Sequence, residues 1–213
     1  MRNIYHDDST YDELSTEGFN AVIGIVLVWG FLLSALLIKF AGNWFATWNP
    51  ILLTVVYIIV AWIGIRISRK SDNPKISFLG YNLVVVPLGV VLSVILRGFP
   101  VISILHAVII TAVVAFAMLL AAIAFPKVFL SMGRILFFAL IVVIVIEILI
   151  GIFGWYHPTL LDWIVAIIFA LYIGYDWACA QQVTKTLDNA IDSCVGLYIN
   201  IVNLFVRVLR LRG

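Results

Sequence analysis

Charged residues are scarce in this chain, and their scarcity excludes an ordinary soluble domain. Lysine, arginine, aspartate and glutamate together account for 11% of its 213 residues, whereas soluble domains contain about 25%. Hydrophobic residues account for 64%. The formal net charge of +2 is too small to indicate a nucleic-acid partner. The composition therefore predicts an integral membrane protein, surrounded by the lipid bilayer.

The sequence also lacks the usual motifs of catalysis and of metal binding. Its two cysteines, Cys179 and Cys194, do not have the spacing of metal ligands, and we expect free thiols. There is no nucleophile motif, no pair of metal ligands and no glycine-rich phosphate loop. We therefore expect neither an enzyme nor a resident cofactor. Residues 1–17 are polar and acidic, unlike a secretory signal peptide, so the first apolar segment should remain as a helix.

Long apolar runs dominate the rest of the chain. Each is close to the roughly 20 residues that a helix needs to cross a bilayer. The sequence thus predicts an all-α polytopic membrane protein, in which residues 1–213 form one transmembrane domain after a polar tail at 1–17. Seven spans are expected, at about 19–40, 50–67, 76–96, 101–125, 135–153, 160–182 and 191–209.

The basic residues predict the orientation of these spans, because lysine and arginine are enriched in cytoplasmic loops. With the N-terminus in the cytoplasm, the inside segments hold Arg2, Arg66, Arg69, Lys70, Lys75, Lys127, Arg134 and Lys185, and the outside loops hold Lys39 and Arg97. We therefore expect a plasma-membrane or inner-membrane protein with a cytoplasmic N-terminus. The basic C-terminus disagrees with a seventh helix that crosses fully. Either its charges are tolerated outside, or this helix does not cross completely.

A polar row interrupts the last apolar span. On a helix its members share one face: Asp192, Gly196, Asn200, Asn203 and Arg207. Such a row cannot face hydrocarbon cheaply, and ionisable residues in this setting indicate a functional site. The alternative is structural. Asp192 and Arg207 would then lie in water at the helix ends, and the asparagines would bond neighbouring helices.

Asp176 and Asn200 are expected to meet. Asp176 follows a long uncharged run in the sixth span, about 9 Å from the cytoplasmic end of its helix at 1.5 Å per residue. Asn200 lies about 13 Å into the seventh span. A short loop joins the two helices, so they should pack side by side. The two side chains can then face each other below the cytoplasmic surface.

The C-terminal third resembles the Bax inhibitor-1 family. The resemblance is carried by the pair Tyr175-Asp176 and, 24 residues beyond Asp176, by the segment LYINIVNLF at 197–205. It implies six helices in two three-helix layers around a central seventh. Bacterial members are pH-sensitive calcium-leak proteins, and two aspartates at the positions of Asp176 and Asn200 share a proton and gate the path. In the family an arginine latches this pair, and Arg66 is similar to it.

Asn200 departs from that pattern, because an amide does not titrate. The resemblance implies a calcium-leak channel with Asp176 as a weak calcium ligand, but the missing second carboxylate puts the pH sensing in doubt and should lower calcium affinity. Arg66 has an alternative role as a charge that sets the topology. The rival function is a non-conducting protein that modulates a membrane protease or another quality-control complex. A solute transporter is a weaker third hypothesis.

Glu147 is the remaining ionisable residue of interest, since no other charge lies in its span. A carboxylate at this depth should be protonated, paired or exposed to water. It either belongs to the ion path or is a structural carboxyl whose hydrogen bonds are satisfied. His106 is a candidate partner, because both lie about five residues from the outer ends of their helices. Counted from the inner ends, however, the two differ by seven residues, or about 10 Å.

Overall fold

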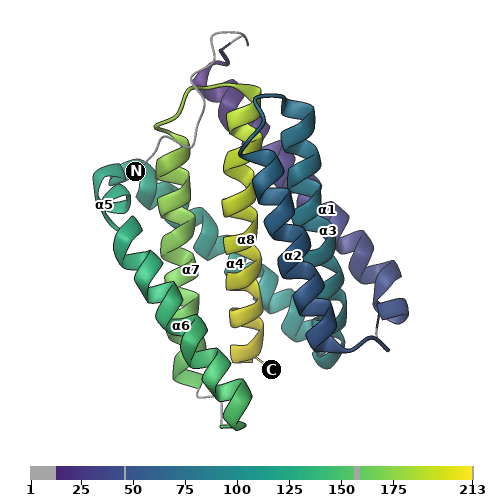
Figure 1. Cartoon of the computed structure of the whole chain (residues 1–213). Helices are drawn as coiled ribbons and strands as arrows, with labels where there is room; N and C mark the ends of the chain where they lie inside the picture. The colour runs from purple at the N-terminus through teal and green to yellow at the C-terminus, as the bar shows by residue number, and fades with distance from the viewer. Residues whose placement is uncertain (1–12, 46, 156–158, 213) are drawn as a thin grey trace. The chain divides into compact units, whose positions relative to one another are not determined.

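The structure is a computed structural model that describes residues 13–45, 47–155 and 159–212, and these residues form helices and connections without strands (Figure 1). The long helices are α1 (Thr16–Phe45), α2 (Pro50–Ser68), α3 (Pro74–Ile95), α4 (Val101–Ala124), α6 (Gly133–Phe153), α7 (Thr159–Ala180) and α8 (Leu187–Arg212). A short 3-10 helix, η1 (Leu96–Gly98), and a short helix, α5 (Pro126–Ser131), lie between them. The all-α class is confirmed. Most of the expected polar tail lies outside the described residues.

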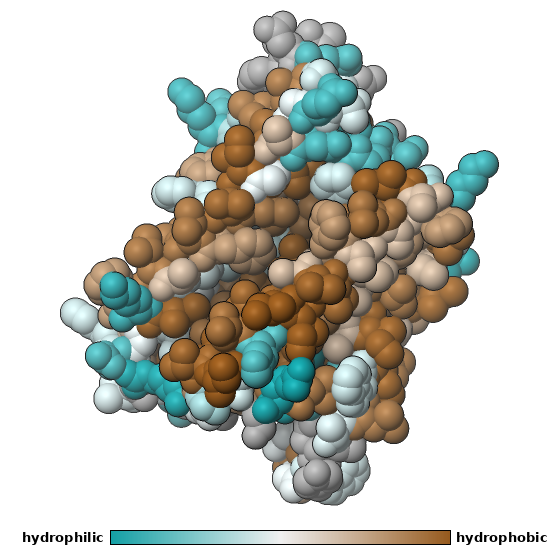
Figure 2. Space-filling model, turned by 180° about the vertical axis from the view of Figure 1, so that it is seen from behind, coloured by the Kyte–Doolittle hydropathy of each residue, from teal (hydrophilic) through white to brown (hydrophobic). Residues whose placement is uncertain are grey.

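Six of the described helices are long and apolar enough to cross a membrane. They are α1, α3 together with η1, α4, α6, α7 and α8. The apolar part of α2, Leu52–Ser68, is shorter. The whole of α2 has 19 residues, or about 28 Å at 1.5 Å per residue, against a hydrocarbon core of about 30 Å. The polytopic membrane fold is therefore confirmed, while a seventh span depends on this shorter helix. Figure 2 shows apolar side chains over most of the visible face, with hydrophilic ones towards its upper and lower ends.

Prolines and capping residues mark the starts and ends of the helices, close to the predicted boundaries. Pro74 begins α3, where the side chain of Asn73 accepts a hydrogen bond from the backbone N–H of Lys75 at 3.0 Å. Gly154 ends α6 with a φ of 63°, a left-handed conformation that glycine adopts without strain. Pro126, which directly follows the expected fourth span at 101–125, begins α5. This short helix was not predicted.

The chain divides into two compact units, and α8 contributes to both. Unit 1 comprises Met1–Phe99 and Gln182–Tyr198, and unit 2 comprises Pro100–Gln181 and Ile199–Gly213. Three of the long helices thus belong to each unit, together with half of α8. Three helices on either side of the division agree with the two three-helix groups that the family resemblance implies.

In unit 1, α3 packs against both α1 and α2. Glycines allow α2 and α3 to approach closely, because a Cβ atom on Gly80 would lie only 2.6 Å from the carbonyl oxygen of Gly64. A pair of buried tyrosines, one of them next to Gly80 in sequence, lies in the core of this unit. The rings of Tyr81 and Tyr198 meet edge to face at 5.8 Å, and the Tyr198 hydroxyl shares a 2.6 Å hydrogen bond with Ser34.

In unit 2, α7 packs against α4, α5 and α6. The ring of Phe129 on α5 lies against Gly174 of α7, where a Cβ atom would come within 2.3 Å of the ring. Gly133, at the start of α6, similarly faces Tyr175, where a Cβ atom on the glycine would come within 2.7 Å of the ring. These two glycines let aromatic side chains attach the short helix α5 and the start of α6 to α7.

Gly80→Val is expected to destabilise the protein, because the added side chain would meet the backbone of α2. Overpacking of this kind costs roughly 1–3 kcal/mol. Thermal unfolding of the purified protein in detergent should show a lower midpoint. Gly24→Val is the matched control, since a Cβ atom at Gly24 meets nothing within 4 Å. Equal midpoints for the two variants would contradict the close contact of α2 and α3.

Candidate functional site

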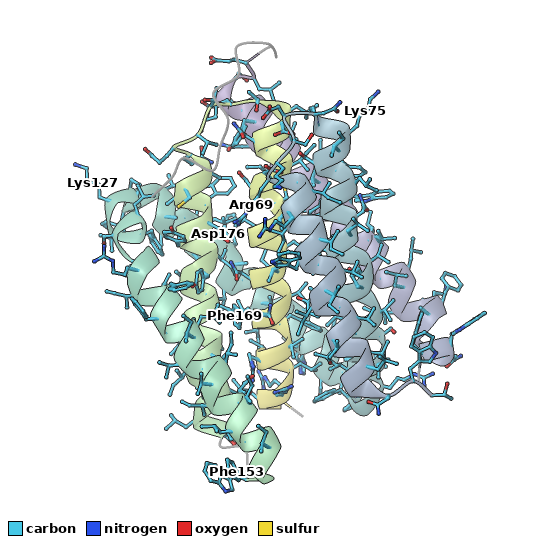
Figure 3. The ribbon with its side chains drawn as sticks, viewed as in Figure 1. Arg69, Lys75, Lys127, Phe153, Phe169 and Asp176 are labelled. Carbon is cyan, nitrogen blue, oxygen red and sulfur yellow. The ribbon has the colours of Figure 1, made fainter. Side chains whose placement is uncertain are left out.

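Asp176 and Asn200 are in direct contact within unit 2 (Asp176 is labelled in Figure 3). The amide nitrogen Nδ2 of Asn200 on α8 donates a hydrogen bond of 2.7 Å to the carboxylate oxygen Oδ2 of Asp176 on α7. Asn200 is buried and Asp176 is partly exposed. The helix spacing predicted this meeting. Asp176 lies only four residues before the end of α7, about 6 Å by the helix rise, so it is nearer the helix end than the expected 9 Å.

Aromatic and polar side chains of α7 surround this carboxylate. The rings of Tyr172 and Tyr175 meet edge to face, with 6.3 Å between their centroids. Both tyrosines lie close enough to Asp176 to interact electrostatically with its carboxylate. Tyr175 is also hydrogen-bonded to Cys179, one turn further along the helix. Cys179 and Cys194 are free thiols, as expected. The α7 side chains around Asp176 are therefore partly polar. Position 200 adds an amide to them and not a second carboxylate.

The site has few ligands for a resident metal ion. In the described part of the chain, no group of three or more His, Cys, Asp or Glu side chains could hold a metal. Asp176 and Asn200 present a carboxylate and an amide, whereas calcium takes six to eight oxygen ligands. A calcium ion at Asp176 would consequently keep most of its ligands as water, which suits a passing ion better than a bound one.

A second polar cluster lies towards the other end of α7, also in unit 2. Arg207 of α8 donates a hydrogen bond of 2.9 Å from Nη1 to Oδ1 of Asp162. Its Nη2 forms an ion pair at 2.5 Å with Oε1 of Glu147 on α6. The side chains of Arg207 and Asp162 are only 10% and 9% exposed. Arg210, 42% exposed, lies 3.9 Å from Asp162. Two positive and two negative charges thus balance in a cluster whose centre, Arg207 and Asp162, is buried.

This cluster corrects two sequence-based expectations. Arg207 does not lie in water at the end of its helix, because the cluster buries it. Glu147 has a different partner from the expected His106, which is exposed on α4. Asp162 was not singled out from the sequence at all. A signal was available, since a buried arginine in an apolar span needs a counter-charge and Asp162 begins the neighbouring helix.

The remaining members of the polar row are placed separately. Asp192 accepts a hydrogen bond from the hydroxyl of Ser68 in unit 1. One turn before it, Asp188 is buried and accepts a 2.6 Å hydrogen bond from Ser77. Asp192 is therefore not simply solvated at a helix end. Asn203 bonds the carbonyl of Ile199 in its own helix at 2.8 Å rather than a neighbouring helix.

Arg66 belongs to unit 1, at the end of α2, and its guanidinium group lies 4.6 Å from the ring centroid of Trp62. This contact is a cation–π interaction, which holds the exposed side chain along its own helix. A latch between Arg66 and Asp176 stays a prediction.

Asp162→Asn is expected to destabilise the protein. Removing one partner of a buried ion pair costs up to about 3–5 kcal/mol when the other charge is left alone. Here Glu147, which is 30% exposed, remains as the second counter-charge of Arg207, so the loss should be smaller than this upper range but larger than that of an exposed pair. Denaturant unfolding in detergent micelles should show this loss. Arg210→Gln is the matched control, since an exposed pair contributes only about 0–1 kcal/mol. If Asp162→Asn is no more harmful than this control, Arg207 does not depend on Asp162.

Two proteins of Helicobacter pylori are similar to this chain. An uncharacterized protein of strain J99 is 28% identical over 223 residues, which cover 100% of this chain and 93% of that protein. An uncharacterized protein of strain 26695 is 38% identical over 86 residues, which cover 39% of this chain and 36% of that protein. The similarity to the first extends over the full length of this chain.

The model of a protein family described as inhibitor of apoptosis-promoting Bax1 matches residues 19–213. This match includes every described helix except the first turn of α1, and it extends well beyond the C-terminal third that carried the resemblance. The chain therefore belongs to the family of inhibitors of apoptosis-promoting Bax1, as a multi-pass membrane protein.

Proposed function

We propose that this protein is a cation-leak channel for calcium and that Asp176 is the group at which calcium and protons compete. The observation that carries the proposal is the hydrogen bond from the buried amide of Asn200 to Asp176. The amide carries no charge, so it positions the carboxylate without neutralising it. Asp176 can then attract a cation near the end of α7.

The position of Asp176 suits an ion that passes rather than stays. It lies about one helical turn from the end of α7, where water and ions have a short way to travel. With one carboxylate and one amide, the site attracts calcium weakly and releases it easily. Conduction requires this balance, since an ion that is bound too tightly does not leave.

The ion-pair cluster of Arg207 has a different role in this proposal. Its charges balance, so it offers a cation little net attraction. It instead ties α6, α7 and α8 together within unit 2 and fixes the rotation of α8 that presents Asn200 to Asp176. The proposal thus assigns ion attraction to one end of the unit and rigidity to the other.

We further propose that the N-terminus faces the cytoplasm of the cell. In unit 1 the backbone N–H of Leu14 donates to the carbonyl of Lys185, and Ser77 at the start of α3 bonds Asp188 at the start of α8. The N-terminal segment, the turn between α2 and α3 and the loop before α8 therefore share one end of this unit. The turn between α2 and α3 carries a cluster of basic residues and the loop before α8 carries Lys185, which supports a cytoplasmic side for this end.

Asp176→Asn should reduce calcium flux sharply, because the variant removes the negative charge that attracts the ion. The measurement is the rate of calcium entry into liposomes that hold a calcium dye and the purified protein. Glu17→Gln removes one carboxylate from the exposed start of α1 and serves as the control. Native protein that leaks no faster than empty liposomes would favour the rival function, a non-conducting modulator of a membrane protease or another quality-control complex.

Asn200→Asp should make the leak more dependent on both pH and calcium. The new carboxylate would lie within hydrogen-bonding distance of Asp176, so the pair would hold one proton tightly and titrate in two steps. The native site has one titratable group in this pair and should give a single step, with flux falling as pH falls and Asp176 is neutralised. Flux measured between pH 5 and pH 8 compares the two proteins. A two-step response in the native protein would place the sensor elsewhere, with Glu147 as the next candidate.

A further inference from the structure

A groove with basic and apolar parts lies at the end of α2 and at the turn that leads into α3, within unit 1. Its volume is about 500 Å³. Arg66, Lys70 and Ser71 contribute its polar part, and Trp62, Ile63 and Ile76 its apolar part. Figure 3 labels Arg69 and Lys75 on either side of the same turn. The groove is separate from the contact between Asp176 and Asn200, which belongs to unit 2.

Three of these residues follow one another from the last turns of α2 into the turn after it. Trp62 and Arg66 are four residues apart on α2, so they share a helix face, and Lys70 lies in the turn directly after the helix ends at Ser68. Trp62 is 57% exposed, although the guanidinium group of Arg66 lies over its ring at 4.6 Å. An aromatic side chain, an arginine and a lysine thus follow each other from the apolar part of the helix to the polar turn after it.

The charge of the groove is of one sign. Two cations and a serine hydroxyl line its polar part, and no carboxylate is among the described residues that line it. An arginine matches the oxygens of a phosphate group with several N–H donors, and a lysine adds a point charge. The groove should therefore bind an anion, and a phosphate in particular.

We propose that this groove binds an anionic phospholipid of the surrounding bilayer. Only a lipid satisfies both parts of the groove, because its phosphate can pair with Arg66 and Lys70 while its acyl chains cover the exposed Trp62, Ile63 and Ile76. A tryptophan and basic residues at a helix end are also the usual anchors at the level of lipid headgroups. A zwitterionic headgroup fits less well, since its own cation would lie close to Lys70.

Quenching of tryptophan fluorescence by brominated lipids tests this proposal in the full-length protein. The protein is reconstituted in phosphatidylcholine with a minor fraction of brominated phosphatidylglycerol, or with the same fraction of brominated phosphatidylcholine. Because the chain has seven tryptophans, the signal of Trp62 is obtained as the difference from Trp62→Phe. The anionic lipid should quench this signal more than the zwitterionic lipid does, and the excess should disappear in the double variant Arg66→Gln/Lys70→Gln.

The matched control is Arg69→Gln/Lys75→Gln, which removes two positive charges from the same end of unit 1 but outside the groove. It should keep the excess quenching. Equal quenching by both lipids in the native protein, or the same loss in both double variants, would overturn the proposal. Relief of the quenching by added inorganic phosphate would overturn the choice of a lipid in favour of a soluble anion. If the double variant does not fold, Lys70→Gln, which changes an exposed side chain, takes its place.

Discussion

The constraint on which the rest of the structure depends is the polar row of α8 in a chain that is otherwise apolar. Each polar side chain in a membrane span needs a partner from the protein, because a buried polar or charged group without one is costly. The partners come from both units: Ser68 bonds Asp192, Asp176 bonds Asn200, and Asp162 pairs with Arg207. These polar residues of α8 therefore each require a polar or charged side chain at a matching position on α2 or α7.

Two of these contacts lie in the same unit but differ in their charge balance. Arg207 is neutralised by acidic side chains on two helices, so the cluster contributes mainly to stability. Asp176 bonds an amide that carries no charge. Asn200 and Arg207 are seven residues apart on α8, which is about 10 Å along the helix. The ion pairs can hold α8 at one position while Asn200 positions Asp176 of α7 at the other, so in the proposed leak stability and ion attraction depend on different residues.

Hydropathy predicted the long helices because prolines or polar turns separate the apolar runs, and Pro50 and Pro74 begin long helices in the structure. The contact between Asp176 and Asn200 could be predicted because the two neighbouring helices are joined by a short loop. The helix α5 could not, since its position depends on the fit of Phe129 against Gly174. Helix depth paired Glu147 with His106 wrongly, because depth says nothing about the direction in which a side chain leaves its helix.

The amide at position 200 also determines how pH can act on the site. Two carboxylates at this distance would repel each other once both had lost their protons, and the helices that carry them would tend to separate. An amide has a donor and an acceptor, so it can bond Asp176 whether that residue is ionised or protonated. The contact of α7 with α8 is therefore compatible with both states. In the proposed leak, a change of pH would then alter the attraction of the site for a cation, while the hydrogen bond that positions Asp176 can remain.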